Sequence, residues 1–210
     1  MSDSLRQRYE ALRVDEALDA YPGLRMVPSH HGRVALRGDL NFRATGPTGE
    51  EIADSYEIEI RMSLGSATEM PEVLETCGRI PIDYHRQDSR RLCVGAPTQI
   101  RFLRKADPTL LGFINGFVVP YLYGHAFFTK YKKMPFGELD HGANGLRDQL
   151  ATMFGAKTSP HAEEFLRLAG MKKRHANKWA CPCDSGRRLG RCHNRVVNAQ
   201  RRRAGRGWFR

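Results

Sequence analysis

The sequence predicts an α+β fold followed by a small module of a different kind at the C-terminal end. Two runs near the N-terminus alternate between apolar and polar residues, as strands with one buried face do. Apolar residues at helical spacing precede and follow these runs. Three of the five cysteines lie close together near the C-terminal end. In 210 residues we therefore expect one ordinary domain, 1–168, and one appended module, 169–210.

The first expected element is an amphipathic helix close to the N-terminus. Leu5, Tyr9 and Leu12 recur at spacings of four and three residues, which places them on one helix face. Ser4 precedes them and is the expected N-cap. The helix is expected to end before Pro22.

Two neighbouring strands are expected next. Residues 33–44 alternate between apolar and mainly charged side chains, with Gly38 as a candidate β-bulge. After a turn rich in Gly and Pro, residues 55–62 alternate in the same way, so the two runs are expected to pair antiparallel. A third short strand is expected at 72–75. The N-terminal helix and an apolar helix around 110–117 are expected to cover the buried face of the sheet.

The rest of the first domain is less regular. Residues 78–97 show no clean period, and an irregular segment of this length inside a compact domain is usually functional. Pro120 is followed by a connection rich in Tyr and Phe, then by a glycine-rich loop at 136–145 and two short helices. Ser159 is the expected N-cap of the second helix, with a proline at its first helical position.

The net charge of +11 belongs to the C-terminal end of the chain. Residues 171–210 carry 13 basic residues and one acidic residue, whereas residues 1–170 carry 21 basic and 22 acidic ones. A near-neutral body with a positive tail can bind an acidic protein surface or nucleic acid through that tail. The alternative is that the arginine-rich end, 201–210, is solvated and disordered.

The sequence also predicts a cytoplasmic protein with no membrane partner. The longest strongly apolar run, 110–122, is shorter than the roughly 20 residues that span a bilayer. The N-terminal segment is charged throughout and lacks the apolar core of a secretory signal. An odd number of cysteines in such a chain argues against a disulfide framework and for metal binding.

The strongest local signal is a group of metal-ligand residues near the C-terminal end. Four of them fall within 13 residues: Cys181, Cys183, Cys192 and His193. Three thiolates and one imidazole can close the tetrahedral site that structural zinc requires. Metal binding would supply folding energy that a segment with few apolar residues lacks, while Gly186 and Gly190 let the loop turn back on the metal. The alternative is a set of free thiols in a disordered tail.

The pattern Cys-x-Cys-x-Ser-Gly followed by Cys-His resembles the SEC-C motif. This is a short basic zinc-binding segment found at the end of the preprotein translocase ATPase and appended to many bacterial proteins. The resemblance implies Zn²⁺ as cofactor, a bacterial source, and a binding or adaptor role for the module.

The order of elements in the body resembles a ubiquitin-conjugating enzyme. That family runs from an N-terminal helix through antiparallel strands, a Pro-rich turn, a His-Pro-Asn segment and the acceptor cysteine to C-terminal helices. Here Met70-Pro71-Glu72-Val73 corresponds to the Pro-rich turn and His85-Arg86-Gln87 to the tripeptide. Cys93, in Leu92-Cys93-Val94-Gly95, corresponds to the acceptor.

The resemblance is closer to a divergent prokaryotic branch of this fold, and it covers roughly residues 20–150. The matching stretches are Arg79-Ile80-Pro81, 110–116, 118–124 and 135–142. It implies a transferase that accepts a ubiquitin-like protein from its activating enzyme as a thioester on Cys93 and passes it to an amine. Gln87 replaces the asparagine that stabilises the oxyanion in the family, and it offers the same amide donor on a longer stem.

Alternatives remain for each residue of this site. Arg90, Arg91 and His85 lie close to Cys93 in sequence and would favour its thiolate if they lie close in space. Otherwise Cys93 is a small buried apolar residue, as most free cysteines are, and the protein is an inactive adaptor that acts through its zinc module. His85 is expected to be a structural hydrogen-bonding group rather than a proton carrier.

Two further residues have weaker contexts. Cys77 is expected to have a packing role. His141, in the glycine-rich loop, is either a base for the attacking amine or an ordinary surface histidine.

Overall fold

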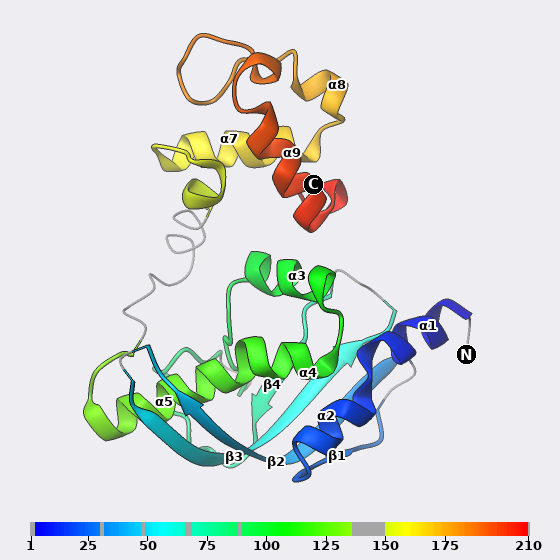
Figure 1. Ribbon diagram of the computed structural model, residues 1–210, viewed down its shortest axis with the longest axis vertical. Helices are drawn as coiled ribbons and strands as arrows, with labels where there is room; N and C mark the ends of the chain where they lie inside the picture. The colour runs from blue at the N-terminus through cyan, green and yellow to red at the C-terminus, as the bar shows by residue number, and fades with distance from the viewer. Residues whose placement is uncertain are drawn as a thin grey trace. The chain divides into compact units, whose positions relative to one another are not determined.

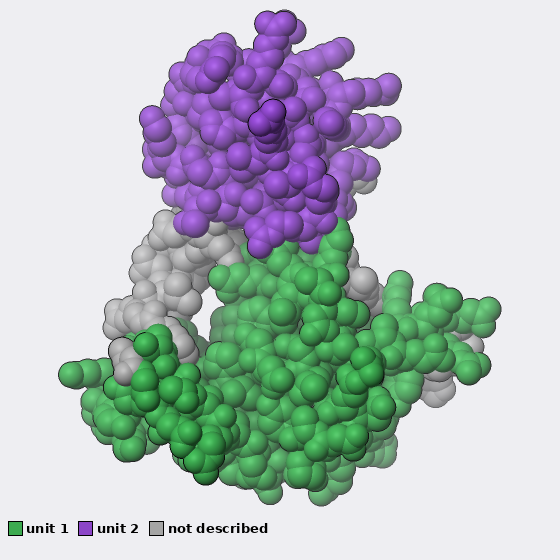
Figure 2. All heavy atoms as spheres, in the orientation of Figure 1, with its two compact units in different colours: residues 1–137 green, residues 138–210 purple. Residues whose placement is uncertain are grey.

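The computed structural model describes residues 3–29, 32–47, 49–65, 69–87, 90–135 and 150–209. The chain forms two compact units, residues 1–137 (unit 1) and 138–210 (unit 2), which Figure 2 distinguishes by colour. This boundary differs from the expected one at 168/169. Helix α7 (Ser159–Gly170) belongs to unit 2 because its Phe165 ring stacks on Phe154 with a centroid distance of 5.5 Å.

Unit 1 is a four-stranded antiparallel sheet with helices before and after it in the chain, which confirms the predicted α+β class (Figure 1). The strands are hydrogen-bonded in the order β1-β2-β3-β4. The elements are α1 (Asp3–Leu12), α2 (Val14–Ala20), β1 (Leu24–Met26), β2 (Arg33–Thr45), β3 (Glu51–Ser63), β4 (Glu72–Glu75), α3 (Pro97–Ala106), α4 (Leu110–Phe113), the π-helix η1 (Ile114–Val118) and α5 (Val119–Tyr131).

The alternation of apolar and polar residues in the two long strands gives the sheet one buried face, as expected. β2 and β3 pair residue for residue along their whole length, so even-numbered residues of both share the buried face. Leu40 and Ile58 on that face are fully buried. The opposite face is charged, and ion pairs such as Arg37 Nη2 to Glu57 Oε1 at 2.9 Å join the strands there. The single buried face explains why helices cover one side of the sheet.

Gly38 is not a β-bulge, because pairing continues through it on both sides of β2. A Cβ atom at Gly38 would lie 2.1 Å from the carbonyl oxygen of Gly23, and the residue has a φ of +143°. The glycine therefore allows the chain just before β1 to approach β2 closely. β1 was not predicted, because three residues are too few to show an alternating pattern.

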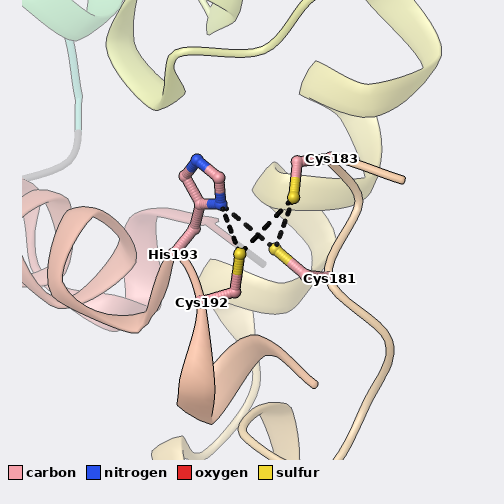
Figure 3. A group of neighbouring side chains, drawn as sticks. All are labelled: Cys181, Cys183, Cys192 and His193. Carbon is pink, nitrogen blue, oxygen red and sulfur yellow. Dashed lines mark hydrogen bonds between the residues drawn. The ribbon is translucent and has the colours of Figure 1, made fainter. Parts of the chain in front are cut away.

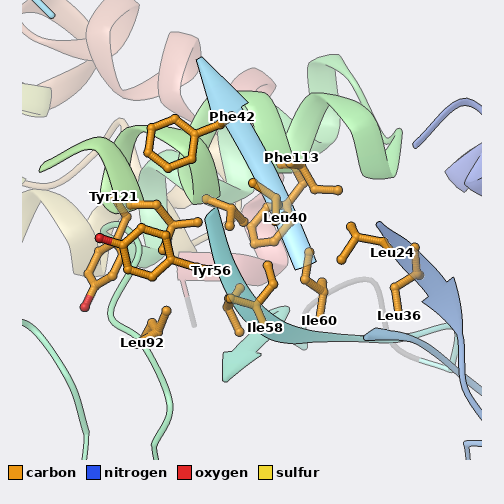
Figure 4. Close-up of a cluster of buried hydrophobic side chains, with 14 of the residues drawn as sticks. Leu24, Leu36, Leu40, Phe42, Tyr56, Ile58, Ile60, Leu92, Phe113 and Tyr121 are labelled. Carbon is orange, nitrogen blue, oxygen red and sulfur yellow. The ribbon is translucent and has the colours of Figure 1, made fainter. Parts of the chain in front are cut away.

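The core of unit 1 lies between the sheet and the helices, and Figure 4 shows part of it. As predicted, the N-terminal helices and the apolar helix cover the sheet. Their fully or nearly fully buried contributions include Leu12, Ala17, Leu110, Phe113 and Ile114. Two helices replace the single N-terminal helix expected, because Arg13 adopts a left-handed conformation with a φ of 46°. Ser4 lies inside α1, which begins at Asp3.

The helix from Leu110 to Tyr131 continues through the region expected to be a connection after Pro120. Proline lacks an N–H and so cannot donate the hydrogen bond that continues an α-helix. Here Pro120 lies in the first turn of α5, directly after the π-helical turn η1, whose hydrogen bonds have a wider spacing, and the helix continues past the proline. By length and composition this 22-residue helix could cross a membrane. However, 61% of its most apolar 18-residue stretch is buried inside the protein, as in the core helix of a soluble protein.

A buried histidine in this helix is expected to make the stability of unit 1 depend on pH. His125 is 4% exposed, and its Nδ1 lies 2.7 Å from the hydroxyl of Tyr56. Burial, and then the charge of Arg79, lowers the pKa of His125 below its ordinary value of about 6.5. The unfolded chain therefore binds a proton at a pH where the folded chain does not. Stability is complete above about pH 6.5 and decreases as the pH falls toward the lowered pKa.

Hydrogen exchange of the β2 and β3 amides, corrected for intrinsic rates, measures this effect. We expect protection to fall between pH 7 and pH 5 in the wild type, and the fall to be abolished in His125→Gln. Tyr56→Phe serves as the control, since it removes the hydroxyl partner but keeps the buried imidazole, so its protection should still decrease with pH. An equal decrease in His125→Gln would assign the titration to another group.

Unit 2 is mainly helical. Residues 150–154 are helical, and α7 is followed by α8 (Lys173–Ala176), the 3₁₀-helix η2 (Leu189–Arg191), α9 (Asn194–Ala204) and the 3₁₀-helix η3 (Arg206–Phe209). The N-cap of α7 is Thr158 rather than Ser159, and its hydroxyl accepts a hydrogen bond from the N–H of His161. The expected glycine-rich loop, 136–145, and His141 lie outside the described residues.

The arginine-rich end of the chain is folded through Phe209, which contradicts the disordered alternative. The guanidinium group of Arg201 donates hydrogen bonds to the carbonyl oxygens of Leu168 at 2.7 Å, Ala169 at 3.0 Å and Met171 at 2.9 Å. These carbonyls belong to the C-terminal turn of α7 and the residue after it, where helix hydrogen bonds are missing. Phe209 is buried in the same unit.

Candidate metal centre and candidate acceptor thiol

The four predicted metal ligands meet in unit 2 (Figure 3). Sγ of Cys183 lies 3.5 Å from Sγ of Cys181 and 3.5 Å from Sγ of Cys192. Nδ1 of His193 lies 3.3 Å from Sγ of Cys181 and 3.2 Å from Sγ of Cys192. In a tetrahedral zinc site, metal–ligand bonds of about 2.0–2.3 Å place the ligand atoms about 3.5–3.8 Å apart. The cluster therefore has nearly the dimensions of a metal site, and these sulfurs are too far apart for disulfides.

A short hairpin positions the first two cysteines. Ala180 and Arg188 form an antiparallel bridge, and the N–H of Cys181 donates to the carbonyl of Arg187 at 2.8 Å. Gly186, with a φ of +66°, allows the reversal between them. The chain therefore turns back within a few residues and presents both thiols to one point.

Gly190 has a different role from Gly186. A Cβ atom there would lie 3.0 Å from the carbonyl oxygen of Asn177, and the N–H of Gly190 donates to that oxygen at 3.1 Å. This contact brings the segment before the hairpin against the segment that leads to Cys192. The expectation that both glycines shape the loop is confirmed.

The histidine ligand is oriented by the start of α9 and by α7. The carbonyl of His193 accepts a hydrogen bond from Val197 at the first turn of α9. Its ring meets Phe165 edge to face, with centroids 5.3 Å apart. Phe165 is fully buried, so it fixes the imidazole with Nδ1 toward the sulfurs. Sequence spacing did not reveal this contact, because α7 lies outside the motif.

Local electrostatics favour thiolate at one ligand and oppose it at another. The hydroxyl of Ser185 lies 3.2 Å from Sγ of Cys183 and lowers the pKa of that thiol to about 6. Burial raises the pKa of Cys181 to about 11. A metal ion deprotonates thiols that coordinate it. Ser185 was part of the sequence motif, but its hydrogen bond to the ligand sulfur was not predicted.

In unit 1 the candidate acceptor Cys93 lies on one arm of a second hairpin. Its N–H donates to the carbonyl of His85 at 2.8 Å, and the N–H of Gln87 donates to the carbonyl of Arg91 at 2.8 Å. The N–H of Leu92 donates to Val73 of β4 at 2.7 Å, which attaches the hairpin to the sheet. The structure therefore brings the backbones of His85 and Cys93 together.

Cys93 is exposed, which contradicts the alternative that it is a buried apolar residue. The preceding residue, Leu92, is buried and fills that structural role. Because side chains alternate along a strand pair, Cys93 and Gln87 share the face opposite Leu92. Gln87 is also exposed and lies two residues along the hairpin from the pair formed by His85 and Cys93.

The two arginines expected to favour the thiolate have other partners. Nη2 of Arg91 lies 2.8 Å from Oε1 of Glu72, and Nη1 of Arg90 donates to the carbonyl of Thr76 at 3.2 Å. Their charges are therefore directed at β4 and the residue after it. Sequence proximity alone could not show this, because both partners lie in or directly after β4.

Tyr121 of α5 supports the same hairpin and was not predicted. Its hydroxyl donates to the carbonyl of Tyr84 at 2.9 Å and lies 3.3 Å from that of His85, which also accepts the N–H of Cys93. Burial strongly raises the pKa of Tyr121, so the hydroxyl stays a donor. His85 has a left-handed φ of 42°, a conformation that is costly for a non-glycine residue and common at functional sites.

The packing role expected for Cys77 is wrong. Its side chain is exposed, and its thiol donates a hydrogen bond to Oε2 of Glu57 at 3.0 Å, which raises the pKa of the thiol. A thiol held protonated beside a carboxylate is a poor nucleophile. Cys77 is therefore a useful control for chemistry at Cys93.

Comparison of the chain with protein-family models, curated proteins and solved structures finds no match.

Proposed function

We propose that unit 1 is an acyl carrier that holds a ubiquitin-like protein as a thioester on Cys93 and transfers it to an amine. The exposed thiol of Cys93, on a hairpin anchored both to β4 and to Tyr121, is the observation that supports this function. The order of helix, antiparallel meander, cysteine hairpin and helices is also that of the ubiquitin-conjugating family, which the sequence motifs resemble.

The chemistry proceeds in two exchanges. The Cys93 thiolate attacks the thioester between the modifier and its activating enzyme, and the thiolate of that enzyme leaves. An amine then attacks the new thioester, Cys93 leaves as a thiolate, and the amine loses a proton. The amide of Gln87 is the candidate donor to the oxyanion of each tetrahedral intermediate, since it shares the hairpin face with Cys93.

We further propose that the cluster in unit 2 binds one Zn²⁺ ion. Three sulfurs and one imidazole nitrogen are a closed tetrahedral set with no position left for substrate, which is typical of structural zinc. The metal would hold the hairpin, η2 and the start of α9 together. In this proposal the zinc ion stabilises unit 2, which serves for binding, and the thioester chemistry takes place in unit 1.

The test of the carrier function is adduct formation. The protein is incubated with a candidate activating enzyme, ATP and the matching ubiquitin-like protein, and analysed with and without a reducing thiol. We expect a thiol-sensitive adduct in the wild type and in Cys77→Ala, and its complete loss in Cys93→Ala. An unchanged adduct in Cys93→Ala would refute the assignment. Failure of the wild type with the modifier systems encoded beside its gene would favour an adaptor of the same fold that acts through unit 2.

A further inference from the structure

We propose that unit 2 binds the phosphate backbone of single-stranded nucleic acid, through α8 and the metal-binding hairpin rather than through the arginine-rich end. The residues of this basic surface are Lys172, Lys173, Arg174, Lys178, Arg187 and Arg188. All six are exposed. The proposal is independent of the carrier function of unit 1.

Basic residues outnumber acidic ones in the described part of unit 2. Its described residues, 150–209, include 14 Lys and Arg and three Asp and Glu. Among these acids, Glu164 binds Arg167, and Asp184 lies 2.9 Å from Nε2 of His161. Within the described part of the chain, none of the six basic side chains forms an ion pair.

Backbone contacts gather the six cations on neighbouring segments. The N–H of Leu189 donates to the carbonyl of Trp179 at 2.8 Å, and the Ala180–Arg188 bridge follows directly. These bonds hold residues 172–180 beside residues 187–190. Leu189 and Cys181 are buried, so the alternating residues Ala180 and Arg188 point outward. Like charges gathered in this way attract a polyanion, which binds with release of its counterions.

The arginine-rich end is less suited to this role because two of its arginines, Arg201 and Arg206, have structural tasks. Arg201 binds three carbonyls around the end of α7, and Nη1 of Arg206 donates to Gly170 at 3.4 Å. Burial lowers the pKa of Arg201. The sequence left open whether this segment binds nucleic acid, and we assign the phosphate contacts to the basic surface instead.

An exposed aromatic side chain favours nucleic acid over an acidic protein. Trp179 is 49% exposed and lies between Lys178 and the hairpin in sequence. The guanidinium of Arg167 lies 4.5 Å from the centre of its ring. Such an aromatic stacks on unpaired bases while basic residues bind the backbone. α8 has only four residues, too short for a helix that reads the major groove, so we expect single-strand binding with little sequence preference.

The test is fluorescence anisotropy of a labelled oligouridine with the full, zinc-loaded chain. We expect affinity to fall linearly in log salt, with a slope of about −0.7 per phosphate contact. Lys178→Glu/Arg188→Glu should weaken binding at least about tenfold and make the slope less steep. Trp179→Ala should weaken binding about tenfold without changing the slope, because stacking releases no counterions.

Arg202→Glu/Arg203→Glu is the matched control, because it changes net charge equally at the arginine-rich end. It should weaken binding clearly less than Lys178→Glu/Arg188→Glu does. Equal or greater loss in this control would overturn the proposal and return the contacts to the C-terminal end. Binding of polyglutamate but not of oligouridine would also overturn it, in favour of an acidic protein partner. Zinc content measured for each variant ensures that only folded chains are compared.

Discussion

Replacing Cys181 with serine is expected to release the metal and unfold unit 2 while unit 1 stays folded. Cys181 is 5% exposed, and its backbone forms part of the hairpin that carries Cys183. Structural zinc contributes an apparent 10–16 kcal/mol in small zinc domains, as much as the total stability of a typical domain, about 5–15 kcal/mol. Loss of one of four ligands is therefore enough to unfold a unit of this size.

Both tryptophans of the protein, Trp179 and Trp208, lie in unit 2, so their emission reports that unit alone. We expect a red-shifted emission and less than one zinc ion per chain in Cys181→Ser, while the β2 and β3 amides keep their protection from exchange. Cys77→Ser is the matched control and should change neither signal. One zinc ion per chain with unchanged emission in Cys181→Ser would contradict the proposed ligand set.

Replacing Phe113 with alanine is expected to destabilise unit 1 by about 3–5 kcal/mol, which is the usual cost of removing a fully buried aromatic ring. Phe113 is 0% exposed and belongs to the same buried cluster as Leu40, part of which Figure 4 shows. Its ring centroid is 6.0 Å from that of Phe117. Phe113 thus lies in the hydrophobic core of unit 1, and loss of its ring leaves a cavity there.

Urea denaturation, monitored by hydrogen exchange of the β2 and β3 amides, measures the loss in the free energy of unfolding. Phe128→Ala removes the same ring from a site on α5 that is 38% exposed, and it should cost about 1 kcal/mol or less. Zinc content and tryptophan emission should be unchanged in both variants. If Phe113→Ala lowers the free energy of unfolding no more than Phe128→Ala does, the ring of Phe113 is not central to the core.

The features predicted correctly from the sequence are those encoded in short stretches of chain. The alternation of β2 and β3 and the spacing of the four metal ligands are complete within their own segments. Long-range contacts determine what the sequence did not reveal. The role of Tyr121 depends on carbonyls some 36 residues away, and Arg201 folds the end of the chain through carbonyls of α7. Pro120 is an ordinary helix breaker, but the π-helical turn before it is not visible in residue propensities.

The unequal lengths of the four strands bear on how the protein avoids self-association. β2 and β3 have 13 residues each, whereas β1 has three and β4 has four, so the far ends of the long pair project as a two-stranded ribbon. Open edges of this kind can recruit a strand from another copy. Charged side chains occupy this ribbon, including the Arg43–Glu51 pair at 2.7 Å and Asp54, which binds Arg79. These charges disfavour edge-to-edge aggregation and leave the ribbon soluble.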